Sequence, residues 1–386
     1  MFQEASAGIQ RPRGALTAGV THALAADSAL LQPIQVGDTH ATNRLFMAPL
    51  TRSRAAADGT PSDLAAEYYS QRAAAGLIIS EATAVSRTAN GAYMNTPGIY
   101  TDAHQAKWAE IAQAVHDTGG KMFVQLWHVG RMGHSEISGV RPVAPSAIAA
   151  DMLTHSPTGK KPLEIPRALD IEEIPGIVAD FRAAARRAID AGMDGVEIHG
   201  ANGYLLHQFA SDVVNQRTDA YGGSPENRAR LTAEVVEAVV AEIGAGRVGL
   251  RISPGNHAGD MREHDMNVYE ALLDRIAPLG IAYLHVLIDP SAHIFGVLRA
   301  LWSGTFVLNT GRDTGTDFSQ LEAYAEWGAI SAAAVGRTYL ANPDLIDRLV
   351  LGAELNEPDV ATFYAPGPVG YIDYPTLAEV AEPRSA

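Results

Sequence analysis

Short apolar segments recur along the chain, and longer segments with helical character separate them. Eight of these runs are too short for a globular helix, and several are rich in Val, Ile or Phe, so they predict buried β-strands. The runs are Arg44–Ala48, Leu77–Ser80, Met122–Trp127, Gly195–His199, Val248–Ser253, Tyr283–Ile288, Phe306–Asn309 and Ala332–Gly336. They are apolar almost throughout instead of alternating, which is typical of a parallel sheet covered on both faces.

Two of the intervening segments carry clear helix signals. Ile171–Ala191 opens with two glutamates and a proline and ends before a glycine, and acids and proline favour the first turn of a helix. In Ser224–Ile243, Ser224 is a candidate N-cap and Pro225 occupies the first helical position.

Eight strands that alternate with helices are compatible with a (β/α)₈ barrel or with a doubly wound open sheet. No Gly-x-Gly-x-x-Gly motif follows any predicted strand, which favours the barrel. The connection over residues 131–170 is long and rich in Gly, Pro and Ser, as functional caps often are. We therefore predict one α/β domain, a (β/α)₈ TIM barrel over residues 31–386, with a capping loop after strand three. Residues 1–30 are expected to form a poorly ordered N-terminal extension.

Composition narrows the classes of partner. The 386 residues include 29 Lys and Arg against 44 Asp and Glu, a net charge of −15, which argues against a nucleic-acid partner. The chain has no cysteine, which excludes disulfides, thiolate metal sites, iron–sulfur clusters and cysteine nucleophiles. No apolar run reaches the roughly 18 residues of a membrane span. The apolar stretch after Arg11 and Arg13 is too weak for a secretory signal, and we expect a cytoplasmic protein.

Polar residues concentrate where the predicted strands end, which is where a barrel has its active site. The most specific strings are Met-Ala-Pro-Leu-Thr-Arg (47–52), Gln-Leu-Trp-His-Val-Gly-Arg (125–131), His-Gly-Ala-Asn-Gly-Tyr-Leu-Leu-His-Gln-Phe (199–209), Arg-Thr-Asp-Ala-Tyr-Gly-Gly-Ser (217–224) and Gly-Tyr-Ile-Asp-Tyr-Pro (370–375). In this order they resemble the old yellow enzyme family, FMN-dependent (β/α)₈ ene-reductases. The resemblance covers about Leu31 to Pro375, nearly the whole chain.

The resemblance implies an FMN site built from strand ends. Its candidate residues are Ala48, Pro49, Thr51, Ala82, Gln125, Arg251, Gly311, Gly336 and Arg337. Flavin reduction places negative charge on the N1–C2=O edge, so a fixed cation such as Arg251 would stabilise the reduced state, although an arginine there can also pair with an acid. Gln125 offers a donor and an acceptor to the pyrimidine edge, and Thr51 resembles the family threonine near flavin O4.

The phosphate of FMN is expected at the ends of strands seven and eight. Gly311 and Gly336 offer unhindered backbone N–H groups, and Arg337 offers a cation. The turn Asn309-Thr310-Gly311 departs from the paired small residues of many family members, so the sequence leaves open which N–H group there contacts phosphate.

Three further residues carry the predicted chemistry. His199 and Asn202 can both donate to a carbonyl or nitro oxygen and withdraw charge from a conjugated C=C, as an oxyanion hole does. The resemblance implies that Tyr204 is the proton donor, a role that a phenol can fill at neutral pH. Aromatic side chains expected in the substrate pocket are Trp127, Tyr93 and Tyr364, although each could be simple core packing.

The activity implied is reduction of activated alkenes, α,β-unsaturated carbonyl or nitro compounds, with NADPH or NADH. Hydride would come from flavin N5 and the proton from Tyr204. Three alternatives are another FMN barrel of the dienoyl-reductase type, a non-catalytic FMN carrier and a metal-dependent barrel hydrolase. The first normally carries a cysteine cluster, the second needs no proton donor, and the strands lack a metal-binding His-x-His pair. We expect no metal, and a monomer or homodimer.

Overall fold

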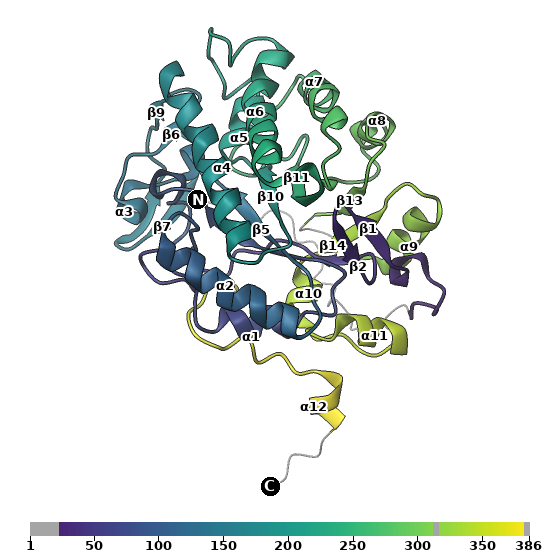
Figure 1. The fold of residues 1–386 in the computed structure, drawn as a ribbon. Coiled ribbons are helices and arrows are strands. Elements are labelled where there is room, and N and C mark those ends of the chain that lie inside the picture. Colours follow the sequence, from purple (N-terminus) through teal and green to yellow (C-terminus); the bar gives the residue numbers. More distant parts are fainter. Residues whose placement is uncertain (1–22, 312–315, 382–386) are drawn as a thin grey trace, which may run out of the picture.

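Eight parallel strands hydrogen-bond side by side and close into a barrel in the computed structural model, which describes residues 23–311 and 316–381 (Figure 1). In chain order they are β3 (Leu45–Met47), β4 (Ile78–Ala84), β5 (Met122–Trp127), β10 (Gly195–Gly200), β11 (Val248–Ile252), β12 (Tyr283–Leu287), β13 (Phe306–Asn309) and β14 (Ala332–Val335). Each strand pairs with the next, and β14 closes the barrel against β3. All eight runs predicted as strands form the barrel, and the predicted fold class is confirmed.

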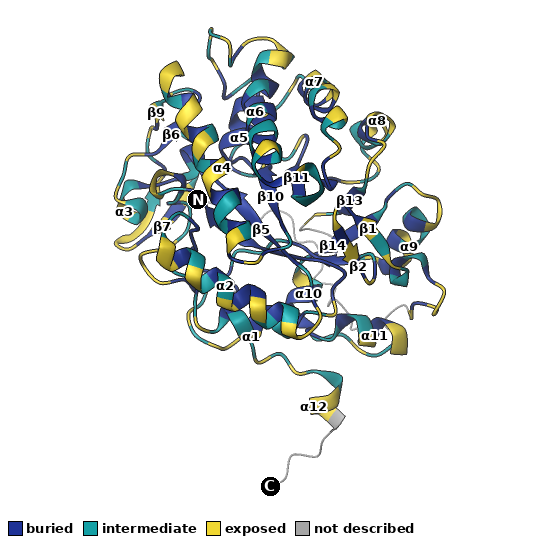
Figure 2. Ribbon diagram, viewed as in Figure 1, coloured by how far each residue is buried: buried dark blue, intermediate teal, exposed yellow. Residues whose placement is uncertain are grey.

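Helices follow the strands and cover the outside of the barrel (Figure 1). They are α1 (Ala65–Ser70), α2 (Asp102–Asp117), α4 (Ile174–Asp190), α5 (Leu205–Ala210), α6 (Pro225–Ile243), α7 (Asn267–Ile276), α8 (His293–Leu301), α9 (Phe318–Glu326), α10 (Arg337–Ala341) and α11 (Leu345–Leu351), and α12 (Leu377–Ala381) lies near the C-terminus. The Ser224 side chain accepts a hydrogen bond from the Asn227 N–H and caps α6. Figure 2 shows the inner helix faces buried and the outer ones exposed.

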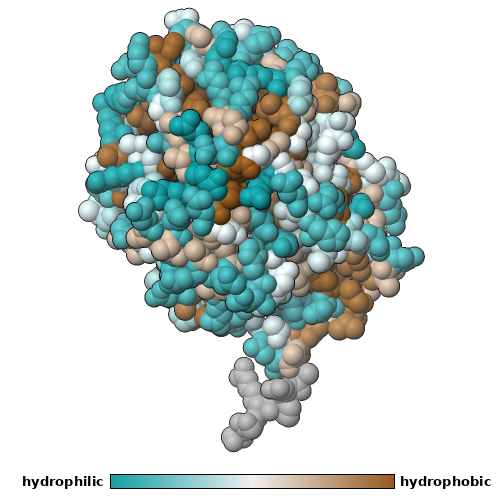
Figure 3. Space-filling view, viewed as in Figure 1, coloured by the Kyte–Doolittle hydropathy of each residue, from teal (hydrophilic) through white to brown (hydrophobic). Residues whose placement is uncertain are grey.

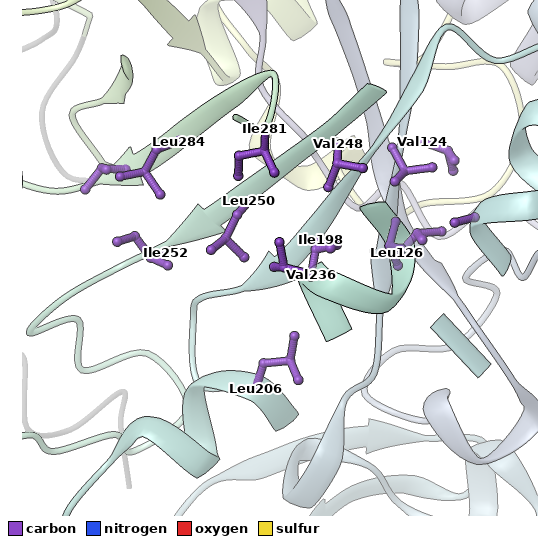
Figure 4. Close-up of a cluster of buried hydrophobic side chains, with 14 of the residues drawn as sticks. Val124, Leu126, Ile198, Leu206, Val236, Val248, Leu250, Ile252, Ile281 and Leu284 are labelled. Carbon is purple, nitrogen blue, oxygen red and sulfur yellow. The ribbon is translucent and has the colours of Figure 1, made fainter. Parts of the chain in front are cut away.

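The larger core lies between the strands and these helices. Branched side chains on the outer faces of β5, β10 and β11 pack against α5 and α6, as Figure 4 shows for Leu126, Ile198, Leu206, Val236 and Leu250. Full burial of such a side chain contributes about 1.5–3 kcal/mol. This continuous layer explains why the strands read as unbroken apolar runs.

A smaller core fills the lower interior of the barrel. A hairpin of β1 (Ile34–Val36) and β2 (Thr39–Ala41) contributes Val36 and Ala41 to it, and Phe46 and Phe123 come from barrel strands. This hairpin closes the barrel at the end opposite the predicted site, and the apolar pattern did not reveal it, since each strand has three residues.

The packed part of the chain begins before residue 31. Leu24 and Leu30 are buried, and the Leu24 N–H donates to the Leu349 carbonyl at 2.9 Å. The predicted extension of residues 1–30 therefore includes residues that belong to the barrel, whereas residues 1–22 lie outside the described part of the chain.

Strand β4 runs further than predicted, to Ala84 instead of Ser80. Its register against β5 shifts between Ile79 and Ala82, and such a bulge re-aims the side chains that follow it. The buried polar residues that hid this extension are hydrogen-bonded; for example, the Ser80 hydroxyl accepts from the Gln125 N–H at 3.0 Å.

The long connection after β5 forms a cap with its own short elements. It contains α3 (Ser135–Ser138), the pair β6 (Val143–Ala144) with β9 (Arg167–Ala168), and the hairpin β7 (Leu153–Ser156) with β8 (Gly159–Pro162). Within residues 23–311 and 316–381, no helix combines the length and apolarity needed to cross a membrane. The face shown in Figure 3 is mostly hydrophilic, with apolar residues gathered in small patches.

Candidate active site

The carboxyl ends of the barrel strands surround a cavity of about 630 Å³, a size typical of small-molecule sites. Nearly all residues predicted for cofactor or substrate line it. They are Ala48, Pro49, Thr51, Ala82, Tyr93, Gln125, His199, Asn202, Tyr204, Arg251, Gly311, Gly336, Arg337 and Tyr364. The fold thus brings together residues that lie up to about three hundred positions apart in sequence.

Trp127 occupies a different place from the other predicted pocket residues. Its side chain is fully buried, and the described residues that line the cavity do not include it. Its ring meets that of Tyr204 edge-on at 4.9 Å and that of Tyr93 at 6.3 Å. Trp127 therefore supports two cavity residues from behind.

The turn after β10 presents the three predicted catalytic residues. The Ala201 N–H donates to His199 Nδ1 at 3.3 Å, so the ring proton of His199 lies on Nε2, and that nitrogen is a donor. The Tyr204 ring lies edge-on to the His199 ring at 5.0 Å. His199, Asn202 and Tyr204 all line the cavity from this side.

This turn has an unusual backbone conformation, which a buried hydrogen bond and close packing maintain. Asn202 has φ +55°, and its N–H donates to the Ser253 hydroxyl at 2.8 Å. Gly203 has φ +79°, and a Cβ there would lie 2.4 Å from the Ala258 carbonyl oxygen. Such strain persists only where the surroundings over-determine it, and it is common at functional sites.

A buried pair stands behind the same turn. The Gly203 N–H donates to His207 Nδ1 at 2.9 Å, and His207 Nε2 lies 3.1 Å from the Glu263 carboxylate. Burial raises the pKa of Glu263, but His207 and neighbouring donors outweigh this effect and hold that pKa below its usual value. His207 lies within a string singled out from the sequence, but only the fold shows that it holds the turn.

The floor of the cavity carries polar side chains of the barrel interior. Gln125 and Arg251 line the cavity, and Glu197 lies below them, fully buried. The Gln125 amide donates to Glu197 Oε1 at 2.8 Å. Glu197 was missed from the sequence because it stands in the middle of an apolar run.

The other end of the cavity is formed by the ends of β13 and β14. Gly311 has φ +103°, which L side chains rarely adopt, and a Cβ at Gly336 would meet its nearest atom, on Leu50, at 3.6 Å. The Asn309 amide donates to the Ala334 carbonyl at 2.7 Å and ties the two strands together. Two glycine backbones and the Arg337 guanidinium thus face one end of the cavity, a donor set that suits a phosphate.

The C-terminal segment closes one side of the cavity through Phe363 and Tyr364. Arg54 donates to the carbonyls of Thr362 at 3.1 Å and Val369 at 2.9 Å, and Arg52 donates to the Gly370 carbonyl at 2.7 Å. The Tyr364 ring stacks on Tyr93 at 5.6 Å. We call Arg52 and Arg54 the arginine clamp. The family string 47–52 contains Arg52 and the string 370–375 contains its acceptor Gly370, but the sequence did not show that the two meet, and Arg54 lies outside both strings.

The described residues contain no group of three His, Asp or Glu side chains arranged to hold a metal ion. The cavity lining instead includes two guanidinium groups, several side-chain amides and small residues. Ala48, Ala82 and Ala334 leave room beside it for a flat ring system.

Comparisons with known proteins identify the family. The model of the NADH:flavin oxidoreductase / NADH oxidase family matches residues 29–356. The chain is 42% identical to 12-oxophytodienoate reductase 2 of Arabidopsis thaliana, covering 91% of this chain and 96% of that protein. The structure of the old yellow enzyme homologue from Zymomonas mobilis superimposes with a TM-score of 0.86 at 42% identity, over 90% of this chain and 99% of the other. The structure of morphinone reductase in complex with tetrahydroNAD gives a TM-score of 0.84 at 43% identity, over 92% of this chain and 99% of the other.

Proposed function

The chain belongs to the NADH:flavin oxidoreductase / NADH oxidase family and, within it, to the old yellow enzyme ene-reductases; from this premise we propose the roles of its individual residues. The enzyme is an NAD(P)H-dependent flavin oxidoreductase with FMN as cofactor, and its relatives reduce alkenes. The observation that carries our assignment is the convergence of His199, Asn202 and Tyr204 on a cavity whose floor bears Gln125 and Arg251.

The residues present fit FMN along the whole cavity. Gln125 and Arg251 would hold the pyrimidine edge, Thr51 the O4 side, and Gly311, Gly336 and Arg337 the phosphate. The small side chains of Ala48 and Ala82, together with Pro49, leave space for the flavin ring to pack against them. When bound, FMN supplies the hydride chemistry that no side chain can perform.

His199 and Asn202 bind the carbonyl or nitro oxygen of the alkene. The proton on His199 Nε2, fixed by the bond to Nδ1, makes this side chain a donor at the moment when charge develops on that oxygen. Because the donor is already oriented, it needs no reorganisation during the reaction.

Tyr204 donates a proton to the α-carbon of the alkene. The Tyr204 ring packs edge-on against the rings of Trp127 and His199, and these two contacts fix the direction of its hydroxyl group. Tyr93 and Tyr364 form the wall of the substrate pocket, and Trp127 supports it from behind.

A two-step spectroscopic experiment tests this function. The purified protein should show the visible absorption of FMN, lose it on anaerobic addition of NADPH or NADH, and regain it on addition of cyclohexenone. His199→Ala together with Asn202→Ala should retain bleaching by the nicotinamide but slow reoxidation by the enone at least 100-fold. Equal reoxidation by the double variant would contradict the proposed oxygen-binding role.

We further propose small activated alkenes as substrates, a cytoplasmic location and a monomer or homodimer. The location is supported by the requirement for NAD(P)H, which is maintained inside cells. Sedimentation velocity distinguishes a 40.9 kDa monomer from a dimer of twice that mass.

A further inference from the structure

A carboxylate lies inside the barrel directly beneath the cavity floor. Glu197 is fully buried on β10, and its side chain meets three polar partners from other strands. Gln125 Nε2 donates to Oε1 at 2.8 Å, whereas the Tyr283 hydroxyl at 3.1 Å and His285 Nδ1 at 2.8 Å both contact Oε2. Oε1 therefore binds the Gln125 amide, whereas Oε2 binds Tyr283 and His285.

The carboxylate is ionised in this environment. Burial raises the pKa of Glu197, but the hydrogen bonds from His285 and Gln125 and the nearby charge of Arg251 outweigh burial and hold that pKa below its usual value. Burial lowers the pKa of His285, so the ring is neutral, and its Nδ1 must carry the proton because a carboxylate only accepts.

This arrangement decides which way the Gln125 amide faces. Since Glu197 Oε1 can only accept, it selects Nε2 of Gln125 and leaves Oε1 of Gln125 for the cavity. Glu197 cannot turn away, because Tyr283 and His285 hold its other oxygen. A fixed acceptor at the cavity floor matches an N–H donor such as the imide N–H of a flavin pyrimidine ring.

We propose that Glu197 is a positioning residue of the FMN site, which fixes the Gln125 amide so that its oxygen faces the imide N–H of the cofactor. The inference rests on the placement of FMN given under Proposed function. Glu197 itself does not touch the cofactor; it acts through Gln125, with Tyr283 and His285 as its anchors.

A double-mutant cycle on FMN affinity tests this role. Glu197→Asp keeps the charge but withdraws the carboxylate by one methylene, so the amide of Gln125 is no longer fixed. Dissociation constants for FMN, measured on the apoprotein by quenching of flavin fluorescence, should rise about tenfold in Glu197→Asp and about tenfold in Gln125→Ala. The double variant should bind FMN as weakly as Gln125→Ala alone, because the positioned group is gone.

The controls separate positioning from a general effect on the barrel. Glu237→Asp shortens a glutamate on the outside of the barrel, where it pairs with Arg275 at 2.6 Å, and should leave FMN affinity unchanged. If Glu197→Asp does not fold, as judged by circular dichroism, the isosteric Glu197→Gln enters the same cycle, since an amide partner no longer selects one orientation. A hundredfold loss in the double variant would mean that Glu197 acts independently of Gln125 and would overturn the inference. If Gln125→Ala binds FMN normally, the placement of FMN itself is wrong, and the inference falls with it.

Discussion

Tyr204 stands between two rings, Trp127 on one side and His199 on the other, and its hydroxyl group is the proposed proton donor. General acid catalysis of this kind contributes about 10²–10⁴ in rate. Tyr204→Phe keeps the ring, and therefore both edge-on contacts, while removing the acid. The variant thus isolates proton transfer from pocket shape.

The loss in Tyr204→Phe should depend on the substrate's own need for a proton. An enone becomes a basic enolate as hydride arrives, so its reduction should slow at least 100-fold. A nitroalkene becomes a nitronate that can leave unprotonated, so its hydride transfer should survive. Stopped-flow measurement of reoxidation with both alkenes checks this, and reduction by NAD(P)H serves as the internal control. Equal losses for both alkenes would leave Tyr204 as a pocket wall.

Arg337 lines the cavity, and we propose it as the cation that binds the FMN phosphate. Charge-assisted hydrogen bonds of this type contribute about 1.5–3 kcal/mol each, which corresponds to an affinity change of at least tenfold. Arg337→Ala should therefore purify with less FMN and regain it only at high FMN concentration. The ratio of visible to ultraviolet absorbance measures occupancy, with Arg182→Ala on the exposed face of α4 as a matched control. Full occupancy in Arg337→Ala would remove Arg337 from the phosphate site.

Residues at strand ends were predictable because a barrel gathers strand ends at one face, so Gln125, His199 and Arg251 could be grouped without knowing a single distance. Glu197 was not predictable in this way. It is in register with Gln125 on the neighbouring strand, but register between distant strands is a property of the closed barrel. Trp127 illustrates the opposite problem, because sequence spacing does not tell whether a ring faces the cavity or packs behind it.

At the scale of elements, the strands were predictable because burial on both faces leaves an unbroken apolar run. The hairpin β1–β2 and the cap elements were not, since strands of two to four residues are too short to show a period. The extension of β4 past Ser80 was hidden by buried polar residues, whose hydrogen bonds to β5 and to the clamp region form only in the folded chain.

The arginine clamp couples two elements that are about three hundred residues apart. Arg54 lies after β3, and its planar guanidinium binds carbonyls of the C-terminal segment and stacks over the Tyr371 ring at 4.5 Å. Phe363 and Tyr364 are placed at the cavity by this attachment, so loss of the clamp should open the pocket without removing any residue that contacts the reactants.

Arg54→Ala should therefore expose the C-terminal segment to local opening. Chymotrypsin, which cuts after Phe363 and Tyr364, should cleave the variant at least tenfold faster than the wild type, and KM for the alkene should rise by a similar factor. Arg186→Ala, on the exposed side of α4, should change neither quantity. Unchanged cleavage together with a raised KM would show that Arg54 affects the alkene by a route other than the clamp.

At the scale of the whole molecule, two buried carboxylates of the barrel behave differently. Glu197 has three side-chain donors and stays ionised, as described above. Glu81 is also buried, and its Oε2 accepts from the Arg52 N–H at 3.0 Å. Burial raises the pKa of Glu81 from 4.5 to about 7, against the opposing effect of Arg52 and Arg54. Burial of the Glu81 carboxylate therefore lowers the stability of the fold whenever that group is ionised.

That cost gives global stability a predictable dependence on pH. Below pH 4.5 Glu81 is protonated in the folded and unfolded chains alike, and it costs nothing. As pH rises from 4.5 to about 7, the unfolded chain releases its proton first, so the free energy of unfolding falls. Above pH 7 Glu81 is ionised in both states, and the free energy of unfolding falls no further. The total decrease is about 3 kcal/mol, since each pKa unit corresponds to roughly 1.4 kcal/mol.

Glu81→Gln removes the ionisation and keeps an oxygen for the Arg52 N–H. Its stability should equal that of the wild type near pH 4.5 and exceed it progressively up to about pH 8, by about 3 kcal/mol or roughly 4 °C in Tm for a chain of this length. Thermal unfolding of the holoprotein across this range measures the difference, and Glu270→Gln, on the exposed side of α7, should follow the wild-type profile. Wild-type and Glu81→Gln curves that stay parallel across the range would mean that Glu81 has the same pKa folded and unfolded. In that case the neighbouring arginines, and not burial, would set the charge beneath the first two strand ends of the site.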